Sequence, residues 1–343
     1  MIYLNLLIIF IILIFIHELG HYIAARFFGA KVTDFSIGFG KTLFSYTDKN
    51  QTKWKFSILP LGGYVKIKGL ENIFQNVEND NIDDNSFQSL SLIKQIIILL
   101  AGSLFNIISA WLCLFFILFF FGIISFSSEI GKVLDNSPAE INDLRVGDII
   151  TEVNGYKINS FDEISNAINN SFISIQIIRN NNIINKQFEL EINNETNRYF
   201  IGIGSTNNTN IEKYSFNKSF LQSIYFVPNY YIATFDYLVK SINNNTLTNE
   251  LSGPIGIVKM ADQLMLDKIK GILFLFIMIS LFVAIFNLFP IPLLDGGHII
   301  YFTLRSMFSN ALPQVVTRLY IVIGISIISF LFILVTINDI FYK

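Results

Sequence analysis

Four long apolar stretches constrain the fold of this chain more than any other feature. An α-helix needs about 20 apolar residues to cross the hydrocarbon core of a bilayer. The stretches that meet this requirement cover residues 2–28, 96–124, 271–289 and 316–341. Of the 343 residues, 52% are hydrophobic and only 15% are charged, which excludes an ordinary soluble globular protein. The sequence therefore predicts an α-helical polytopic membrane protein with four transmembrane helices.

The first apolar stretch has one alternative interpretation, a cleaved signal peptide. No basic residue precedes its apolar run, and the place of a cleavage site is taken by His-Glu-Leu-Gly-His (His17–His21). Both features favour a membrane-spanning helix.

Lysine and arginine in the loops predict the orientation, because these residues accumulate on the cytoplasmic side of a membrane. The loop after the first stretch is rich in lysine. The loop between the third and fourth stretches carries Arg305 and Arg318, with no acidic residue after Asp295. We therefore expect both loops in the cytoplasm, and both termini and residues 127–265 outside.

The charge and cysteine content exclude two further classes of protein. The net charge of −2, without a basic cluster, gives no indication of a nucleic-acid partner. Cys113 is the single cysteine, so no disulfide can form within one chain.

The composition changes sharply after the second apolar stretch. Apolar and polar residues alternate between turn signals, which predicts strands near residues 130–134, 148–153, 174–179 and 186–191 and a helix at 162–170. We expect residues 127–205 to form a small α+β domain, inserted between an N-terminal membrane half (1–126) and a C-terminal membrane half (266–343). Residues 206–265 between them are predicted to form amphipathic extracytoplasmic helices.

The loop between the first two apolar stretches contains FSILPLGGYVKIKGL (Phe56–Leu70). Its Pro-Leu-Gly-Gly sequence lies between two short β-prone runs, which is typical of a hairpin. The segment is too apolar to lie freely in water, and non-helical backbone at membrane depth must be buried in protein or line a wet cavity. We expect a re-entrant β-hairpin at about residues 56–70, with an interfacial hairpin as the alternative.

Two histidines and a glutamate lie inside the first apolar stretch. His17 and His21 are four residues apart, so on a helix they project from one face and are spaced to hold one zinc ion, with Glu18 beside it. Ionisable groups at membrane depth are rare and usually functional. The alternative is a structural cluster that bonds to other helices.

The third histidine lies in a second motif, NLFPIPLLDGGHII (Asn287–Ile300). Its prolines and glycines break a helix, and such broken backbone is expected to line a cavity, with a packing kink as the alternative. A catalytic zinc site usually has three protein ligands, and the motif offers Asp295 and His298 as candidates for the third. At 1.5 Å per residue, His17 and Asn287 lie about 22 and 24 Å along their helices, so both motifs reach a similar depth.

Together the two motifs resemble those of the site-2 protease family of intramembrane zinc metalloproteases. The resemblance rests on His-Glu-Leu-Gly-His and on Asn-x-x-Pro-x-Pro-x-Leu-Asp-Gly (Asn287–Gly296). Three more segments resemble the bacterial branch that includes the regulator of sigma-E protease: FSIGFGK (Phe35–Lys41), PLGGYVK (Pro60–Lys66) and LSGPIGI (Leu251–Ile257).

This resemblance implies a ligand set and a function. It implies Zn²⁺ held by His17, His21 and Asp295, in preference to His298, with Glu18 as the catalytic base and Asn287 as a residue that holds the substrate. The implied protein is a zinc endopeptidase of the bacterial inner membrane. It would cut within or near the transmembrane segment of single-span proteins, such as anti-sigma factors or remnant signal peptides, in regulated intramembrane proteolysis.

Two features depart from the family pattern. The second apolar stretch reads AGSLFNIISA (Ala101–Ala110), where Ser103 replaces a common proline while Asn106 is retained. The inserted segment has room for one PDZ-like domain, whereas some relatives carry two. The PDZ resemblance rests on NSPAEINDLRVGDIITEVNG (Asn136–Gly155). PDZ domains bind a peptide strand beside a helix, so we expect a groove near Ile130–Val133; the alternative is a spacer or size filter.

The substrate of such an enzyme must unwind locally, because the bonds of a helix shield its peptide groups. The predicted hairpin is suited to receive the unwound strand by edge pairing. We therefore expect Gly63, Tyr64, Val65 and Lys66 to bind substrate, with plugging of the cavity as the alternative role.

Three other functions compete with the protease interpretation of the sequence. A membrane zinc transporter would also place histidines and an aspartate in its spans, but it would not need Glu18, and the sequence has no inverted repeat. A catalytically inactive PDZ membrane adaptor would not need the intact ligand set. A zinc protease with its site in a cytoplasmic domain would ordinarily lack the second motif in a span.

Overall fold

The computed structural model describes most of the chain and divides it into two compact units. The described residues are 2–70, 84–168, 170–193, 198–206, 209–243, 268–308 and 313–341. One unit comprises residues 1–117 and 219–343, and the other comprises residues 118–218. The segment LSGPIGI and residues 71–83 lie outside the described residues.

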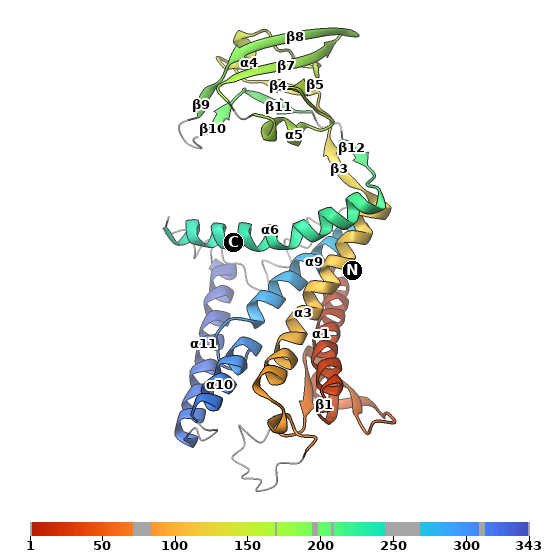
Figure 1. Ribbon diagram of the computed structural model, residues 1–343, viewed down its shortest axis with the longest axis vertical. Coiled ribbons are helices and arrows are strands. Elements are labelled where there is room, and N and C mark those ends of the chain that lie inside the picture. The colour runs from red at the N-terminus through yellow and green to blue at the C-terminus, as the bar shows by residue number, and fades with distance from the viewer. Residues whose placement is uncertain are drawn as a thin grey trace. The chain divides into compact units, whose positions relative to one another are not determined.

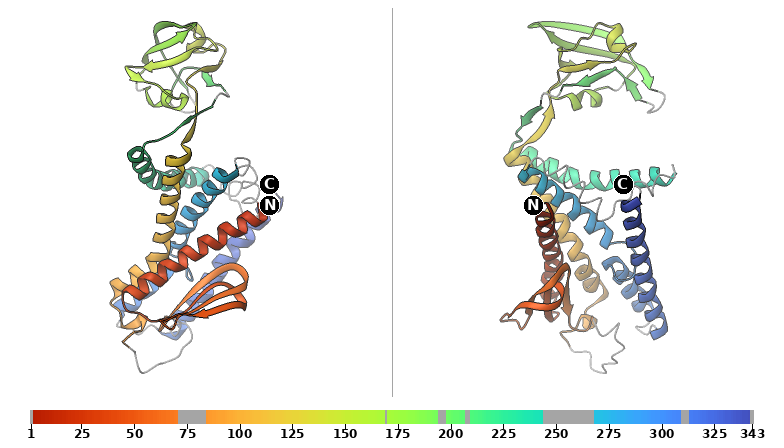
Figure 2. Two further views of the ribbon diagram at one scale, coloured as in Figure 1. Left: turned by 90° about the vertical axis from the view of Figure 1, so that its right-hand side faces the viewer. Right: turned by 180° about the vertical axis from the view of Figure 1, so that it is seen from behind.

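Four long helices run through the first unit (Figures 1 and 2). They are α1 (Ile2–Phe27), α3 (Leu92–Phe116), α9 (Lys268–Asn287) and α11 (Gln314–Phe341). The turn η1 (Phe87–Ser89) precedes α3, and α3 continues into the π-helical segment η2 (Ile117–Phe121). Among the described residues, these four segments are long and apolar enough to cross a membrane. The prediction of four transmembrane helices is confirmed.

Helices α1 and α3 cross at small residues. A Cβ added to Gly20 would lie 2.4 Å from the carbonyl oxygen of Ala101, and one added to Gly102 would lie 2.4 Å from Nε2 of His21. Small residues let the backbones of membrane helices approach closely. The crossing therefore brings α3 against the histidine-bearing face of α1.

The predicted hairpin belongs to a larger β structure that begins at Val32. Strand β1 (Val32–Thr47) pairs antiparallel with β2 (Lys53–Ile67). The register gives residues 34–37 two sets of partners, residues 53–56 and residues 63–66. Because a strand has two edges, residues 34–37 lie between these two parts of β2.

This register corrects one detail of the predicted hairpin. The two β-prone runs around Pro-Leu-Gly-Gly both form strand, but β1 separates them, so they are not each other's partners. The chain reverses instead at Asp48–Thr52, where the Asp48 carboxylate accepts the backbone N–H groups of Asn50 and Thr52 at 2.9 Å each. Each of the two runs pairs with residues 34–37 of β1 instead of with the other run.

The β structure is fastened to α1 by aromatic residues. Trp54 Nε1 donates to Asp48 Oδ2 at 3.0 Å, and the hydroxyl of Tyr22 in α1 reaches the same oxygen at 3.4 Å. The ring of Phe35 stacks on Trp54 and meets Phe15 of α1 edge-on. These contacts hold β2 against the part of α1 that carries the histidines.

Helix α10 (Asp295–Met307) packs against α11 and α3. The Tyr320 hydroxyl of α11 donates to the carbonyl oxygen of Gly297 at 2.7 Å, and the hydroxyls of Tyr301 and Thr317 lie 3.1 Å apart. The first contact fixes the first turn of α10, at which Asp295 lies, and the second holds the turn that follows.

Helix α6 (Phe216–Asn243) lies across the ends of α3, α9 and α11 in Figure 1, mostly within the first unit. The Tyr231 hydroxyl donates to the carbonyl oxygen of Leu281 in α9 at 3.1 Å. Among the exposed apolar residues of α6, a subset recurs with helical spacing: Leu221, Tyr225, Ile232, Phe235 and Val239. Residues 244–267, which the sequence also predicts as amphipathic helices, lie outside the described part of the chain.

The second unit is a small α+β domain. Its strands are β3 (Ile123–Phe126), β4 (Ile130–Val133), β5 (Ile149–Val153), β6 (Tyr156–Lys157), β7 (Phe172–Arg179), β8 (Asn182–Glu189), β9 (Glu191–Asn193), β10 (Arg198–Phe200), β11 (Ile203–Ser205) and β12 (Thr209–Glu212). Its helices are α4 (Pro138–Ile141) and α5 (Phe161–Asn166). One sheet has the order β6-β5-β7-β8, and β4 pairs with β11, β9 with β10 and β3 with β12.

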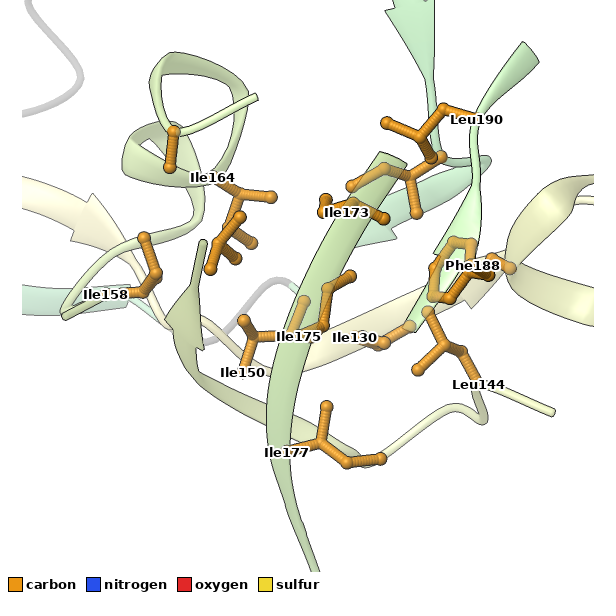
Figure 3. Packing of buried hydrophobic residues seen from close by; sticks show 14 residues of the cluster. Ile130, Leu144, Ile150, Ile158, Ile164, Ile173, Ile175, Ile177, Phe188 and Leu190 are labelled. Carbon is orange, nitrogen blue, oxygen red and sulfur yellow. The ribbon is translucent and has the colours of Figure 1, made fainter. Parts of the chain in front are cut away.

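Alternation of side chains builds the core of this unit. Ile173, Ile175 and Ile177 of β7 are fully buried and meet Ile130 and Ile150 in one cluster (Figure 3). At the surface, Arg145 and Arg179 hold the pKa of Asp143 at about 2.

The four predicted strands are confirmed, whereas the predicted helix ends at Asn166 rather than at residue 170.

At Ile130, one end of the expected peptide groove near Ile130–Val133, both edges of β4 are occupied. Strand β4 pairs with β11 along one edge. On its other edge, Ile130 bonds through its N–H to Asp148 and through its carbonyl to Gly147, at 2.8 Å each. A peptide therefore cannot add at Ile130. Strand β11 pairs with β4 alone among the described strands.

Candidate metal centre

Helix α1 presents the two histidines from one face. His17 and His21 are 9% and 8% exposed, and their Nε2 atoms lie 3.2 Å apart. Glu18 lies between them in the sequence and faces the same cavity. The four-residue spacing thus places both imidazoles on one face of the helix, as the sequence predicts.

A broken segment after α9 brings Asp295 to the same place. Helix α9 ends at Asn287, and tight turns lead to α10, which begins at Asp295. A Cβ on Gly296 would lie 2.1 Å from the carbonyl oxygen of Leu288, and one on Gly297 would lie 2.1 Å from that of Ile291. Only glycine lets α10 start so close to this segment, which explains the two glycines after Asp295.

The three side chains have the separations that zinc requires. Asp295 Oδ2 lies 3.3 Å from His17 Nε2, and Asp295 Oδ1 lies 3.5 Å from His21 Nε2. Two ligand atoms at 2.0–2.1 Å from a tetrahedral zinc lie about 3.3 Å apart. Asp295 Oδ2 is buried and has no hydrogen-bond partner among the described residues. Two imidazoles and one carboxylate, whose buried Oδ2 has no hydrogen-bond partner among the described residues, fit a divalent cation of the zinc type.

His298 belongs to the surroundings of this group rather than to it. It lines the same cavity, but among the described residues only His17, His21 and Asp295 place ligand atoms within 4.8 Å of one another. The choice between Asp295 and His298 that residue chemistry leaves open is thus answered by geometry in favour of Asp295.

A cavity of about 500 Å³ lies beside the group. Its lining includes the broken segment, the end of α9 and part of β2: Leu13, Ile14, His17, Glu18, His21, Gly62, Gly63, Tyr64, Val65, Ile67, Leu70, Ile98, Leu99, Val283, Asn287, Leu293, Leu294, Asp295 and His298. Polar groups and apolar walls in one such cavity can take a peptide chain.

Strand β2 approaches the glutamate directly. The backbone N–H of Val65 bonds to the Glu18 carboxylate. A Cβ on Gly63 would lie 2.7 Å from Ile14 and 3.0 Å from Cγ of Glu18. The absence of a side chain at Gly63 therefore lets β2 lie against α1 at the site.

The sequence-predicted residues come together with one exception. Asn287 Nδ2 lies 3.2 Å from His17 Nε2, and Gly63, Tyr64 and Val65 line the cavity. Lys66 is absent from the lining, and its ammonium lies 5.8 Å from the Tyr64 ring.

Sequence reasoning missed the part played by α3. Gly102 gives the histidines room, and the Ile98 carbonyl accepts a hydrogen bond from His21 Nδ1 at 2.8 Å. The available signal was a glycine in the middle of an apolar helix, a residue type that marks close helix contacts in membranes.

Comparisons with known proteins agree with this geometry. The model of peptidase family M50 matches residues 5–331. Proteins named zinc metalloproteases from Rickettsia conorii, Campylobacter jejuni and Helicobacter pylori are each 33% identical to this chain. The match covers 96% of this chain in all three, and 95%, 90% and 96% of the respective relatives.

Among the solved structures that are similar to part of the chain is the PDZ domain of an SdrC-like protein from Listeria monocytogenes. The identity is 22% and the TM-score is 0.22, over 24% of this chain and 90% of the other.

The family match extends over nearly the whole chain, and the ligand geometry is that of a zinc site in a protein with four membrane-spanning helices. The chain belongs to peptidase family M50, the site-2 protease family, and is a zinc metalloendopeptidase.

Proposed function

We propose that this metalloprotease cuts single-span membrane proteins within or near their transmembrane segments. The observation that carries the proposal is the location of the ligands: His17 and His21 lie inside an apolar spanning helix, and Asp295 follows the end of another. A site built into spanning helices supports a substrate that is itself in the membrane. Anti-sigma factors and remnant signal peptides are the substrate types we propose, in regulated intramembrane proteolysis.

The site residues divide the chemistry between them. When zinc is bound by His17, His21 and Asp295, it supplies Lewis acidity, which polarises a carbonyl oxygen and lowers the pKa of water. Glu18 accepts the proton of the attacking water and passes it to the leaving amine. The amide N–H of Asn287, beside His17, donates to the substrate backbone. A transporter would have no use for a carboxylate at Glu18.

The edge of β2 supports a way to hold the unwound substrate. Residues along a strand direct their N–H and C=O groups alternately to its two edges. Val65 directs its N–H to Glu18, whereas the Lys66 carbonyl accepts from Thr33 of β1. Gly63 and Val65 thus offer their backbone groups to the cavity, and we propose that a substrate strand pairs there.

The orientation that we propose follows the basic loops. The turn at Asp48–Thr52 and the loop between α10 and α11 lie in the cytoplasm of a bacterial cell. Both termini and the second unit lie outside, and the site lies toward the cytoplasmic side. Water reaches a site near one face more easily than one in the middle of the membrane.

The second unit is proposed to take a peptide of the substrate or of a partner. Strand β4 is paired on both edges at Ile130. Strand β11 has one partner among the described strands, so we propose that the peptide pairs with β11. Phe161 and Ile164 of α5 share a hydrophobic cluster with Ile203 of β11, so a peptide beside β11 would have a helix near it.

Replacing Glu18 by glutamine tests the proposed base. We expect Glu18→Gln to keep its zinc, because the three ligands are intact, and to lose cleavage by about 10²–10⁴-fold. Purified protein in detergent would be assayed with a model single-span substrate, and its zinc content measured. Glu189→Gln, at an exposed position of β8, is the matched control. Equal cleavage by Glu18→Gln and wild type would reject the base.

Replacing Val65 by proline tests the substrate strand. Proline removes the N–H that faces Glu18, whereas Val65→Ala keeps it. We expect cleavage of a single-span substrate to fall strongly in Val65→Pro and to stay near wild type in Val65→Ala, with zinc content unchanged in both. Undiminished cleavage by Val65→Pro would argue against edge pairing.

Cysteine labelling tests the orientation. In a Cys113→Ser background, Lys49→Cys places a thiol in the exposed turn between β1 and β2, and Asn182→Cys places one at the exposed start of β8. We expect a membrane-impermeant maleimide to label Asn182→Cys on intact spheroplasts, and Lys49→Cys only after permeabilisation. The reverse pattern would overturn the proposed topology.

A further inference from the structure

Helix α3 faces the two histidines with three residues spaced four apart, Ile98, Gly102 and Asn106. Ile98 contacts His21 through its carbonyl, Gly102 lies beside both rings, and Asn106 contacts His17. Each histidine therefore has a polar partner on α3, on the side of its ring away from Asp295.

The partner of His21 fixes the tautomer of that ring. Its Nδ1 lies 2.8 Å from the Ile98 carbonyl, which can only accept, so Nδ1 carries the proton. A neutral imidazole then has its lone pair on Nε2. This is the nitrogen that faces Asp295.

The partner of His17 on α3 is the side-chain amide of Asn106, and its oxygen and nitrogen must exchange places to satisfy the hydrogen bonds. Asn106 Nδ2 lies 3.3 Å from His17 Nδ1, and Asn106 Oδ1 is buried with no partner among the described residues. The Nε2 of His17 faces Asp295, His21 and the amide nitrogen of Asn287. It is therefore the nitrogen that would bind the metal, and Nδ1 would then carry the proton. An amide nitrogen only donates, so two donors would meet. The two ends of an amide are nearly the same in shape, and their assignment follows from the hydrogen-bond network.

We propose that Asn106 is a positioning residue for zinc binding: its Oδ1 accepts the Nδ1–H of His17 and sets the ring for the metal. Partners of this kind fix the tautomer and orientation of metal-binding histidines. Asn106 is 0% exposed, so water does not compete for the bond. Its backbone carbonyl is held by the hydroxyls of Ser109 and Ser280, at 2.9 Å each. The proposal concerns the metal site alone and is independent of the substrate.

Zinc affinity of the full-length protein, measured by competition with a chelator, tests the proposal. Asn106→Leu has neither donor nor acceptor and is expected to bind zinc about 10–100-fold more weakly. Asn106→Asp offers only acceptors and is expected to restore near wild-type affinity. Ser103→Ala is the matched control on α3, because Ser103 is buried and its hydroxyl has no partner among the described residues.

Three outcomes of this comparison would overturn the proposal. They are wild-type affinity in Asn106→Leu, equal weakness in Asn106→Asp and Asn106→Leu, or an equal loss in Ser103→Ala. The second would mean that the nitrogen of Asn106, not its oxygen, meets His17.

A measurement on the metal-free wild type needs no variant of Asn106 to fold. The chain has three histidines, so ¹⁵N-labelled imidazoles are resolvable by NMR, and His17→Gln assigns the signal. At a pH where the ring is neutral, we expect the proton of His17 on Nδ1 before any metal is added. A proton on Nε2 would overturn the proposal.

Discussion

Two imidazoles and a carboxylate meet within 3.5 Å of one another, largely buried among apolar helices. Buried polar groups are costly unless they are paired, and buried charges are usually paired or bound to a metal. A single divalent cation can pair with all three groups at once, because their lone pairs converge on one point. The rest of the first unit can be understood as the framework that brings these three groups to one point.

That framework depends on glycines at contacts between backbones. Gly20 and Gly102 let α1 and α3 cross, Gly63 lets β2 lie on α1, and Gly296 and Gly297 let α10 begin against the segment that follows α9. None of these glycines has a side chain that could bind a metal. Each removes a side chain that would separate the histidines, the glutamate or the aspartate from the others.

The sequence predicted most of the site, because its chemistry is encoded locally. His17, Glu18 and His21 are fixed by helix periodicity alone, and the broken helix after Asn287 was evident from its prolines and glycines. The choice between Asp295 and His298 could not be made from residue chemistry, since both lie in the first turn of α10. It depends on which side chain that turn directs at His17, and only the family resemblance anticipated the answer.

The structure differs from the sequence-based expectations in strand partners, which the sequence encodes weakly. Pro-Leu-Gly-Gly has the composition of a hairpin turn, but residues 34–37 lie between its flanking runs. Likewise the peptide groove was expected near Ile130–Val133, whereas both edges of β4 are occupied at Ile130, by β11 and by Gly147 and Asp148. Both differences have one cause: pairing over long sequence separations is decided by packing, not by local pattern.

The metal site can be tested directly by locating the ion in crystals of the zinc-loaded protein. We predict one anomalous-scattering peak at the zinc edge, about 2.0–2.2 Å from His17 Nε2, His21 Nε2 and a carboxylate oxygen of Asp295. A peak ligated by His298 with Asp295 turned away, or zinc bound only elsewhere on the protein, would contradict it.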